Sequence, residues 1–423
     1  MILKNNKISV VLSAVMLSLL MPVAAQKYLG APYSRFGWGE VQQRSSERTR
    51  SMGGAAYAYR SSVCVNSKNP ASYTMFDSLS AVVDAAVSFR THRLMEGEQQ
   101  QHGSTAYADY FSFGLPVMSR WAVAFGIQPF SIVSYDYVFE HASGQSNDRG
   151  DGGTYELFWG NGIRITPHLS VGLQASYLFG TSCRSHELVF SDEMSLHLRS
   201  VEEDMMRGFL LNGGLQYELT VGKNLLGIGF VFTPSFSRFV HIDRNAYHMT
   251  YRVSTAVETP VDTLYREGDR VRMLPVRNPA MAGCGLSWSR PESFWLGVDA
   301  EWNGWSRYAV GESTDSLRDM FRFSAGAGWI PQAGSSNYFK KITYSAGCFY
   351  EQDYVLFGET SFHRIGMDLG FVFPVKKNKS GIGLNLETGV YAPDKGEGIH
   401  EQYYRITLHL QLHERWYQHR KLE

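Results

Sequence analysis

The chain has 423 residues, its 40 Lys and Arg balance 40 Asp and Glu, and 14% of its residues are aromatic. A neutral chain lacks the basic field on which nucleic-acid binding depends, so no nucleic-acid partner is expected. An apolar content of 44% excludes a disordered chain, and four cysteines are too few for a disulfide scaffold. The length allows two or three ordinary domains, or one large architecture.

Residues 1–25 have the layout of a secretory signal peptide. Lys4 and Lys7 precede a mostly apolar run over residues 8–21, and small residues end the segment at Ala25. A single membrane anchor is the alternative, because the run approaches the length that spans a bilayer. The small-residue end favours the signal peptide, and the lack of a following cysteine argues against a lipoprotein anchor. We expect the protein to function outside the cytoplasm.

Residues 26–78 are rich in glycine and other turn-forming residues and show no clear strand pattern. A segment of this length is too long for an ordinary loop in a compact domain. Aromatic and apolar residues such as Phe36, Trp38 and Met52 disfavour a disordered arm. The segment is therefore expected to pack inside a larger structure.

From residue 79 onward, apolar and polar residues alternate. Near the end of the chain, Ile406, Leu408 and Leu410 interleave with Thr407 and His409. Neighbouring residues of a strand face opposite sides, so each such segment has one apolar and one polar face. No later stretch is apolar enough for a membrane-spanning helix. Fourteen strands are predicted near residues 79–90, 104–117, 121–140, 152–166, 169–184, 207–221, 224–239, 279–290, 293–308, 320–331, 338–352, 361–374, 380–391 and 402–413.

These strands could form a soluble β-sandwich or a membrane barrel. Three features favour the barrel: strands long enough to cross a membrane, aromatic residues flanking their apolar faces, and connections that alternate between short and long. Long connections are predicted at 91–103, 141–151, 185–206, 240–278, 309–319, 353–360 and 392–401. The aromatic girdle is predicted to include Trp121, Tyr135, Tyr137, Trp295, Trp305, Tyr308, Tyr403 and Tyr404.

The fold prediction is an all-β, 14-stranded antiparallel transmembrane β-barrel over residues 79–413, in the outer membrane of a Gram-negative bacterium. An even strand number and alternating connections place both termini in the periplasm, with a short periplasmic tail at 414–423. The lumen of such a barrel is too wide for wall side chains to fill. Residues 26–78 are therefore predicted to form an N-terminal hatch, or plug, inside it.

Polar side chains on the lumen faces of the strands are the candidates for a chemical site. An acid/base or metal site is one interpretation, but a barrel interior is normally polar, and solvated side chains are favoured. His409 and His413 lie about 13 Å apart on a strand, too far to share a metal. No catalytic motif, metal or cofactor is predicted, and we expect no enzyme. The four cysteines are expected to be free. The candidate lumen residues are Asp84, Asp299, Glu301, Asp368, Glu387 and Arg405.

Several short motifs occur in an order that is similar to one protein family. They are Met52-Gly53-Gly54-Ala55 and Asn69-Pro70-Ala71 early in the chain, then the segments 294–299, 305–308 and 321–328. The mature chain resembles the FadL/TodX family of outer-membrane hydrophobic-compound transporters. The resemblance implies a hatch that blocks the lumen, a ligand pocket beside it and a lateral exit into the membrane. It places the Asn69-Pro70-Ala71 turn in the hatch inside the barrel. We expect these three residues, together with Phe36, Trp38 and Met52, to bind ligand or gate the hatch.

Two functions follow as hypotheses. The first is passive uptake of hydrophobic small molecules, such as long-chain fatty acids, with outer-membrane lipid as the surrounding partner. The predicted loop at 240–278 is charged, however, and does not resemble an apolar capture groove. The second hypothesis is therefore a FadL-like barrel that serves as an anchor or shuttle subunit of a surface protein secretion or assembly complex, with a surface lipoprotein or secretion component as partner.

Overall fold

A computed structural model describes residues 32–415, except 193–194, 236–239, 255–256, 267–271, 311–316, 376–378 and 396–397. The predicted signal peptide lies outside the described residues, as does all of the predicted tail beyond Arg415. No helix in the described ranges is long and apolar enough to cross a membrane.

The described strands form a closed antiparallel barrel whose wall has 14 strands, which confirms the predicted fold class. The barrel closes where the last strand pairs with the first wall strand, from Ser80 opposite Arg415 to Met95 opposite His400. Four wall strands are interrupted and carry two labels each. The wall consists, in order, of β2 (Ser80–Glu96), β3 (Gln99–Met118), β4 (Trp121–Ile132) with β5 (Tyr135–His141), β6 (Gly144–Arg164), β7 (Leu169–Phe190), β8 (His197–Val221), β9 (Asn224–Thr233) with β10 (Val240–Ser254), β12 (Arg272–Arg277) with β13 (Met281–Arg290), β14 (Phe294–Asn303) with β15 (Ala309–Val310), β16 (Met320–Trp329), β17 (Thr343–Phe357), β18 (Thr360–Pro374), β19 (Gly381–Pro393) and β20 (His400–Arg415).

Alternate side chains of the wall face opposite environments, as the sequence pattern predicts. Leu408 on β20 is 58% exposed, whereas its neighbour Thr407 is fully buried. On β6, Trp159 is exposed on the outside while Glu156 is buried in the interior. An apolar exterior around a polar interior is the arrangement that suits a barrel surrounded by lipid.

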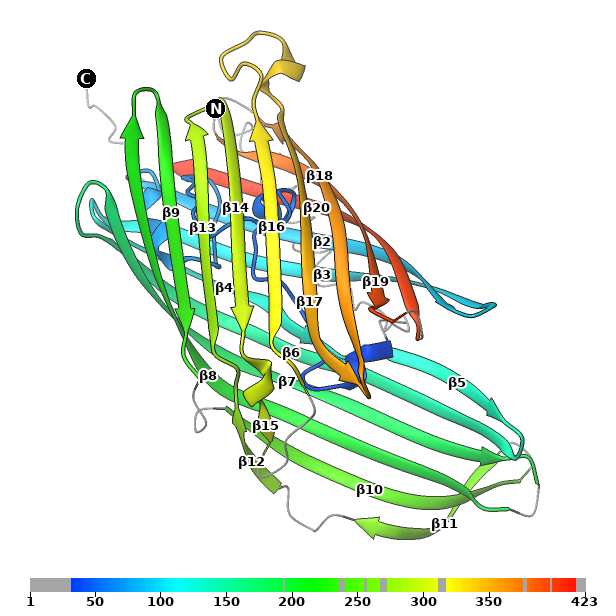
Figure 1. Ribbon diagram of the computed structural model, residues 1–423. Helices are drawn as coiled ribbons and strands as arrows, with labels where there is room; N and C mark the ends of the chain where they lie inside the picture. Colours follow the sequence, from blue (N-terminus) through cyan, green and yellow to red (C-terminus); the bar gives the residue numbers. More distant parts are fainter. Residues whose placement is uncertain are drawn as a thin grey trace, which may run out of the picture.

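The two ends of the barrel differ, but not in the way predicted. At one end, which we call the turn end, short connections join the strands, as at 119–120, 222–223 and 291–293. It lies at the top of Figure 1. At the opposite hairpin end, most of the predicted long loops are wrong, because strands continue through them. Residues 97–98 alone separate β2 from β3, and residues 142–143 alone separate β5 from β6.

The charged stretch at 240–278 is also largely strand rather than loop. Its described residues form β10, β11 (Val257–Arg266) and β12, and β11 pairs with β10 at the hairpin end. The connection between β16 and β17 differs in the other direction. There β17 begins at Thr343 rather than near residue 338, and a 3-10 helix, η4 (Tyr338–Lys341), precedes it.

Residues 32–78, which we call the N-terminal segment, run through the barrel interior and are drawn in dark blue in Figure 1. Their regular elements are η1 (Pro32–Arg35), β1 (Glu40–Val41), α2 (Glu47–Arg50) and η2 (Pro70–Met75). Most side chains from Ser45 to Thr74 are buried. Hydrogen bonds join the segment to wall strands on every side of the lumen, including β3, β8, β14, β17 and β19.

Glycines in the wall let the segment approach the strands closely. A Cβ atom at Gly347 of β17 would lie 2.1 Å from the backbone nitrogen of Gly53, and one at Gly172 of β7 would lie 2.4 Å from that of Ala71. Both distances are shorter than non-bonded atoms tolerate. The glycine-rich lumen faces of these strands therefore serve as contact surfaces for the segment.

Candidate functional site

An aromatic cluster in the lumen surrounds Trp38 of the N-terminal segment. The indole packs edge-to-face against Phe130 of β4, with ring centroids 5.0 Å apart, and against Trp305, at 5.5 Å. Trp305 in turn stacks on Tyr354 of β17 at 4.1 Å. Edge-to-face and stacked aromatic pairs stabilise beyond the area that they bury. The cluster therefore joins the part of the segment around Trp38 to β4 on one side and, through Trp305, to β17 on the other.

A cavity of about 70 Å³ adjoins this cluster. It has room for about five water molecules. Its apolar lining includes Trp38, Phe130, Leu210, Met281 and Trp305, and its polar lining includes Arg44, Lys68, Asn278 and Glu301. Its lining combines aromatic walls with a few polar groups, as small-molecule sites do, in a cavity smaller than the roughly 300 Å³ or more that is usual for such sites.

The polar side of the cavity is built around Glu301 of β14. Its carboxylate accepts a hydrogen bond from the Tyr57 hydroxyl at 2.6 Å and lies 3.3 Å from the Lys68 ammonium group. Lys68 also lies over the Tyr57 ring, 4.8 Å from its centroid. Two strand positions away, Asp299 accepts the backbone N–H groups of Ala56 and Tyr57, at 2.6 and 2.9 Å. Both predicted carboxylates thus bind the segment.

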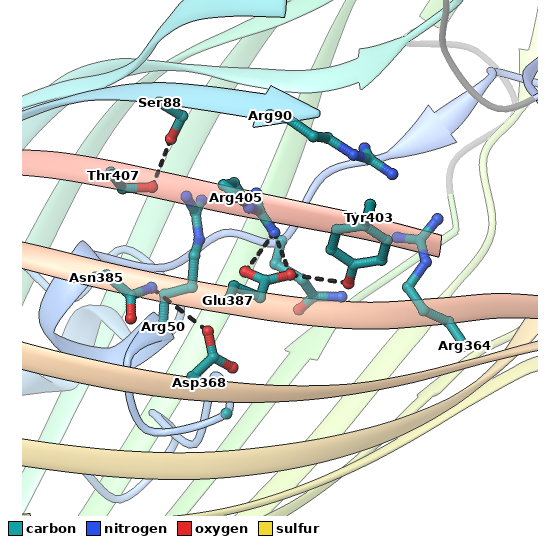
Figure 2. Close-up of polar contacts among 12 residues, drawn as sticks. Arg50, Ser88, Arg90, Arg364, Asp368, Asn385, Glu387, Tyr403, Arg405 and Thr407 are labelled. Carbon is teal, nitrogen blue, oxygen red and sulfur yellow. Dashed lines mark hydrogen bonds and ion pairs between the residues drawn. The ribbon is translucent and has the colours of Figure 1, made fainter. Parts of the chain in front are cut away.

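Elsewhere in the lumen, a network of ion pairs and hydrogen bonds joins β18, β19 and β20 to the segment (Figure 2). Arg405 of β20 donates to both carboxylate oxygens of Glu387, each at 2.5 Å, and the Tyr403 hydroxyl donates to the same carboxylate at 2.9 Å. Asp368 lies beside them and accepts a hydrogen bond from Asn385 at 3.4 Å. Asn385 also donates to Glu47 of the segment at 2.7 Å, so the wall network continues into the segment.

The pKa values of two carboxyl groups in the segment move in opposite directions. Burial raises the pKa of Glu47 to about 7, even though Arg50 acts to lower it. Burial also acts to raise the pKa of Glu40, but Arg90 and Arg364 outweigh it and hold the value at about 2. A buried carboxylate stays charged only where cations surround it. Glu40 is therefore a firmly charged anchor, whereas Glu47 can change its protonation near neutral pH.

The remaining predicted hatch and lumen residues bind parts of the fold together. Asn69 accepts the Ala71 N–H at 3.1 Å, which begins η2, and donates to the carbonyl oxygen of Tyr57 at 2.7 Å. Pro70 and Ala71 lie against glycines of the wall, and so does Met52. Asp84 accepts the Tyr110 hydroxyl at 2.9 Å, and that hydroxyl accepts the Glu47 N–H. Phe36 packs against the aromatic cluster without lining the cavity.

Of the predicted hatch and lumen residues, the structure brings only Trp38 and Glu301 to the cavity. Sequence reasoning missed Phe130 and Leu210, whose lumen-facing positions in alternating strands were a usable signal. It also assigned Trp305, Tyr308 and Tyr403 to the aromatic girdle, which is wrong, because each is at most 3% exposed and faces inward. Tyr135 was assigned to the girdle too, but its side chain is also buried.

Within the described residues, no group of three or more His, Cys, Asp and Glu side chains could hold a metal ion. The four cysteines are free: Cys64 is buried in the segment, and the other three are exposed on the wall.

Comparison with known proteins gives a family and a set of similar folds. The family model BamG matches residues 3–423. The monoaromatic hydrocarbon channel CymD is 14% identical over 91% of this chain and 100% of its own, with a TM-score of 0.59. The toluene transporter TodX of Pseudomonas putida is 14% identical over 89% and 100%, with a TM-score of 0.60. A FadL homologue of Pseudomonas aeruginosa is 10% identical over 90% and 100%, with a TM-score of 0.60.

A comparison with curated proteins finds no match. At such low identities, the solved structures show a shared fold alone. The predicted resemblance to FadL/TodX barrels is confirmed at the level of the fold.

Proposed function

The chain belongs to the BamG family of outer-membrane barrels, and from the fold that it shares with hydrophobic-compound channels we propose that it admits small hydrophobic molecules passively through the outer membrane. The observation that carries the proposal is the cavity beside Trp38. It lies between the N-terminal segment and the wall, and aromatic side chains line it on two sides. In this proposal residues 26–78 form a plug, the turn end faces the periplasm, and ligand arrives from the hairpin end.

A lateral exit is supported by the way the wall is paired between β3 and β4. Their ladder begins beside the turn, where Met118 lies opposite Trp121, and it ends at Phe111 opposite Ile127. Farther along β4, Ser131 and Ile132 pair instead with β1 of the segment. In the described pairing, residues 99–110 of β3 bond only to β2. A small movement of β1 away from β4 would therefore open a route from the lumen to lipid.

Binding would draw on the apolar lining of the cavity. Each CH₂ group that a ligand buries contributes about 0.8 kcal/mol. Lys68 and Arg44 at the polar side would favour a molecule whose far end carries an oxygen or a negative charge. Phe36, Trp38 and Met52, with the Asn69-Pro70-Ala71 turn, are the proposed hatch residues, with Trp38 making the ligand contact.

The test is equilibrium binding of a labelled long-chain fatty acid and of toluene to the purified full-length barrel. We expect saturable binding, weakened by at least tenfold in Trp38→Ala, because the variant removes one aromatic wall of the cavity. Trp288→Ala is the matched control, since Trp288 is 46% exposed on the outside of β13. Absence of saturable binding, or an equal loss in both variants, would contradict the proposal.

A second function is favoured by the ion-pair network and by the extended hairpin end. Buried ion pairs join Arg50 to Asp109 and Lys68 to Glu301 of the wall, and β11 extends the sheet by pairing with β10 at the hairpin end. Such a barrel would suit an anchor subunit of a surface assembly or secretion complex. It predicts stoichiometric copurification of a surface lipoprotein or secretion component after mild extraction. A lone monomer under these conditions would leave only the uptake function.

A further inference from the structure

The connection between β16 and β17, residues 330–342, is an ordered projection at the turn end (Figure 1). Asn337 begins its 3-10 helix η4 by accepting the Phe339 N–H at 3.0 Å. The Gln332 N–H donates to the Lys340 carbonyl oxygen at 2.8 Å, which closes the connection on itself. Hydrogen bonds of this kind hold the backbone of η4 in one conformation, so its side chains point in defined directions.

Two aromatic side chains of η4 are exposed, and the Tyr338 hydroxyl donates to the Pro374 carbonyl oxygen at the end of β18, at 3.3 Å. Phe339 is 70% exposed, which is the highest value among the large apolar side chains described, and Tyr338 is 48% exposed. Burying a phenylalanine side chain fully is worth about 1.5–3 kcal/mol. A rigid turn that exposes these two rings to water forgoes that stabilisation, whereas the same turn in contact with lipid gains it.

The turn is continuous with the lipid-facing surface of the barrel. The Tyr344 hydroxyl donates to the Phe339 carbonyl oxygen at 3.1 Å. Tyr344 faces outward, because the next residue of β17, Ser345, faces the lumen and donates to Ser51 at 2.8 Å. Its ring meets those of Trp329 and Phe371 on the neighbouring strands, at centroid distances of 6.2 and 5.9 Å. These three rings form a row at the rim of the wall, of the kind found at membrane interfaces.

Two cations follow directly after the aromatic pair. Lys340 and Lys341 end η4, and neither forms an ion pair with a carboxylate of the described residues. Long lysine side chains at a membrane interface extend toward the headgroups while their methylene groups contact apolar surface. Near an anionic membrane surface, each contributes about 1 kcal/mol of attraction.

We propose that Tyr338-Phe339-Lys340-Lys341 is a membrane-interface anchor that binds anionic phospholipid. Phe339 and Tyr338 enter the boundary between headgroups and acyl chains, above the row of Trp329, Tyr344 and Phe371. Lys340 and Lys341 contact the lipid phosphates. The anchor fixes the depth of β16 and β17 in the leaflet at the turn end, and it does not depend on what passes through the lumen.

The test uses the full-length chain in nanodiscs, with the native cysteines replaced by alanine and a spin label attached at Phe339→Cys. Collisions of the label with oxygen report lipid, and collisions with a water-soluble nickel chelate report water. In discs containing phosphatidylglycerol, we expect the label to meet oxygen preferentially. Lys223→Cys, in the short β8–β9 turn at the same end, is the matched control and should meet the nickel chelate.

Charge is tested in the same background by K340Q/K341Q, with binding of short-chain phosphatidylglycerol measured in detergent. We expect an affinity loss of about thirtyfold, the factor that corresponds to two lysines near an anionic surface. Inorganic phosphate should not compete at millimolar concentration. The proposal is overturned if the label at position 339 is as accessible to nickel as the control, or shielded from both reagents. It is also overturned if phosphate competes, or if the double variant binds lipid unchanged.

Discussion

Arg50 of the N-terminal segment pairs with Asp109 of β3 inside the lumen, with Nη2 of the arginine 3.1 Å from Oδ1 of the aspartate. The same guanidinium lies 3.1 Å from Glu47. All three side chains are at least nine-tenths buried, so the pair joins the segment to the wall where water cannot compete. Removing one partner of such a pair leaves an uncompensated buried charge.

Arg50→Met should therefore loosen the segment from the wall. We expect a loss of about 3–5 kcal/mol in the free energy of local opening of residues 45–58, measured by hydrogen exchange with mass spectrometry. Lys395→Met is the control, because Lys395 and Glu359 form an exposed pair at 3.6 Å that should contribute at most about 1 kcal/mol. Equal protection in both variants would show that the buried pair does not hold the segment.

Gly347→Ala should displace the segment by steric contact alone. A methyl group there would lie 2.1 Å from the backbone of Met52 and Gly53, and backbone atoms cannot rotate out of the way. We expect exchange protection at residues 52–54 to fall by about 1–3 kcal/mol and the conductance of the barrel in planar bilayers to rise. Gly334→Ala is the control, since nothing lies within 4 Å of its position. Unchanged conductance and protection would mean that the wall shifts instead.

Asn69→Ala tests whether the Asn-Pro-Ala turn is a structural anchor. The variant removes the partner of the buried Ala71 N–H and the donor to Leu215, so we expect a loss of about 1–3 kcal/mol in unfolding by denaturant. Asn337→Ala is matched to it, because Asn337 begins an exposed 3-10 helix in the same way and should cost less than about 1 kcal/mol. Losses of equal size would show that burial of the turn adds nothing.

The strands were predictable because their signal is local. Alternation over ten residues is enough to identify a two-sided strand, and β18 (Thr360–Pro374) begins and ends within one residue of the predicted 361–374. The extended hairpins were missed because the charged residues in segments 91–103 and 185–206 led to the prediction of loops there. Outside the membrane a strand can be polar on both faces, so its composition no longer separates it from a loop.

The interior of the barrel was harder to predict than its wall. Tyr403 and Tyr404 were both assigned to the girdle, although neighbouring strand residues must face opposite sides, and Tyr403 faces the lumen. Trp305 turns inward because β14 ends at Asn303, and Gly304 then leads into a 3-10 helix, η3 (Trp305–Arg307), that begins at Trp305. The partners of Arg50 and Glu47 lie on β3 and β19, and no local pattern relates positions so distant in the sequence.

The segment should hold the wall more firmly at mildly acidic pH than at neutral pH. Burial raises the pKa of Glu47 from an ordinary value of 4.5 to about 7, so the folded state binds this proton more tightly than the unfolded state does. The resulting stabilisation is complete below pH 4.5 and is lost as pH rises through 7, by about 3 kcal/mol in total. Glu40 acts in the opposite direction, but only as pH falls from 4.5 toward 2.

Glu47→Gln separates this carboxyl group from other titrations. The amide keeps the acceptor for Asn385, which lies 2.7 Å from the Glu47 carboxylate, and it cannot ionise. In the unaltered chain, we expect exchange protection of residues 45–52 to fall between pH 5 and pH 8, after correction for the intrinsic exchange rate. In Glu47→Gln, that part of the pH dependence should disappear while the protection at pH 5 is retained. If both proteins show the same slope, another titrating group near Arg50 and Asp109 controls the attachment of the segment.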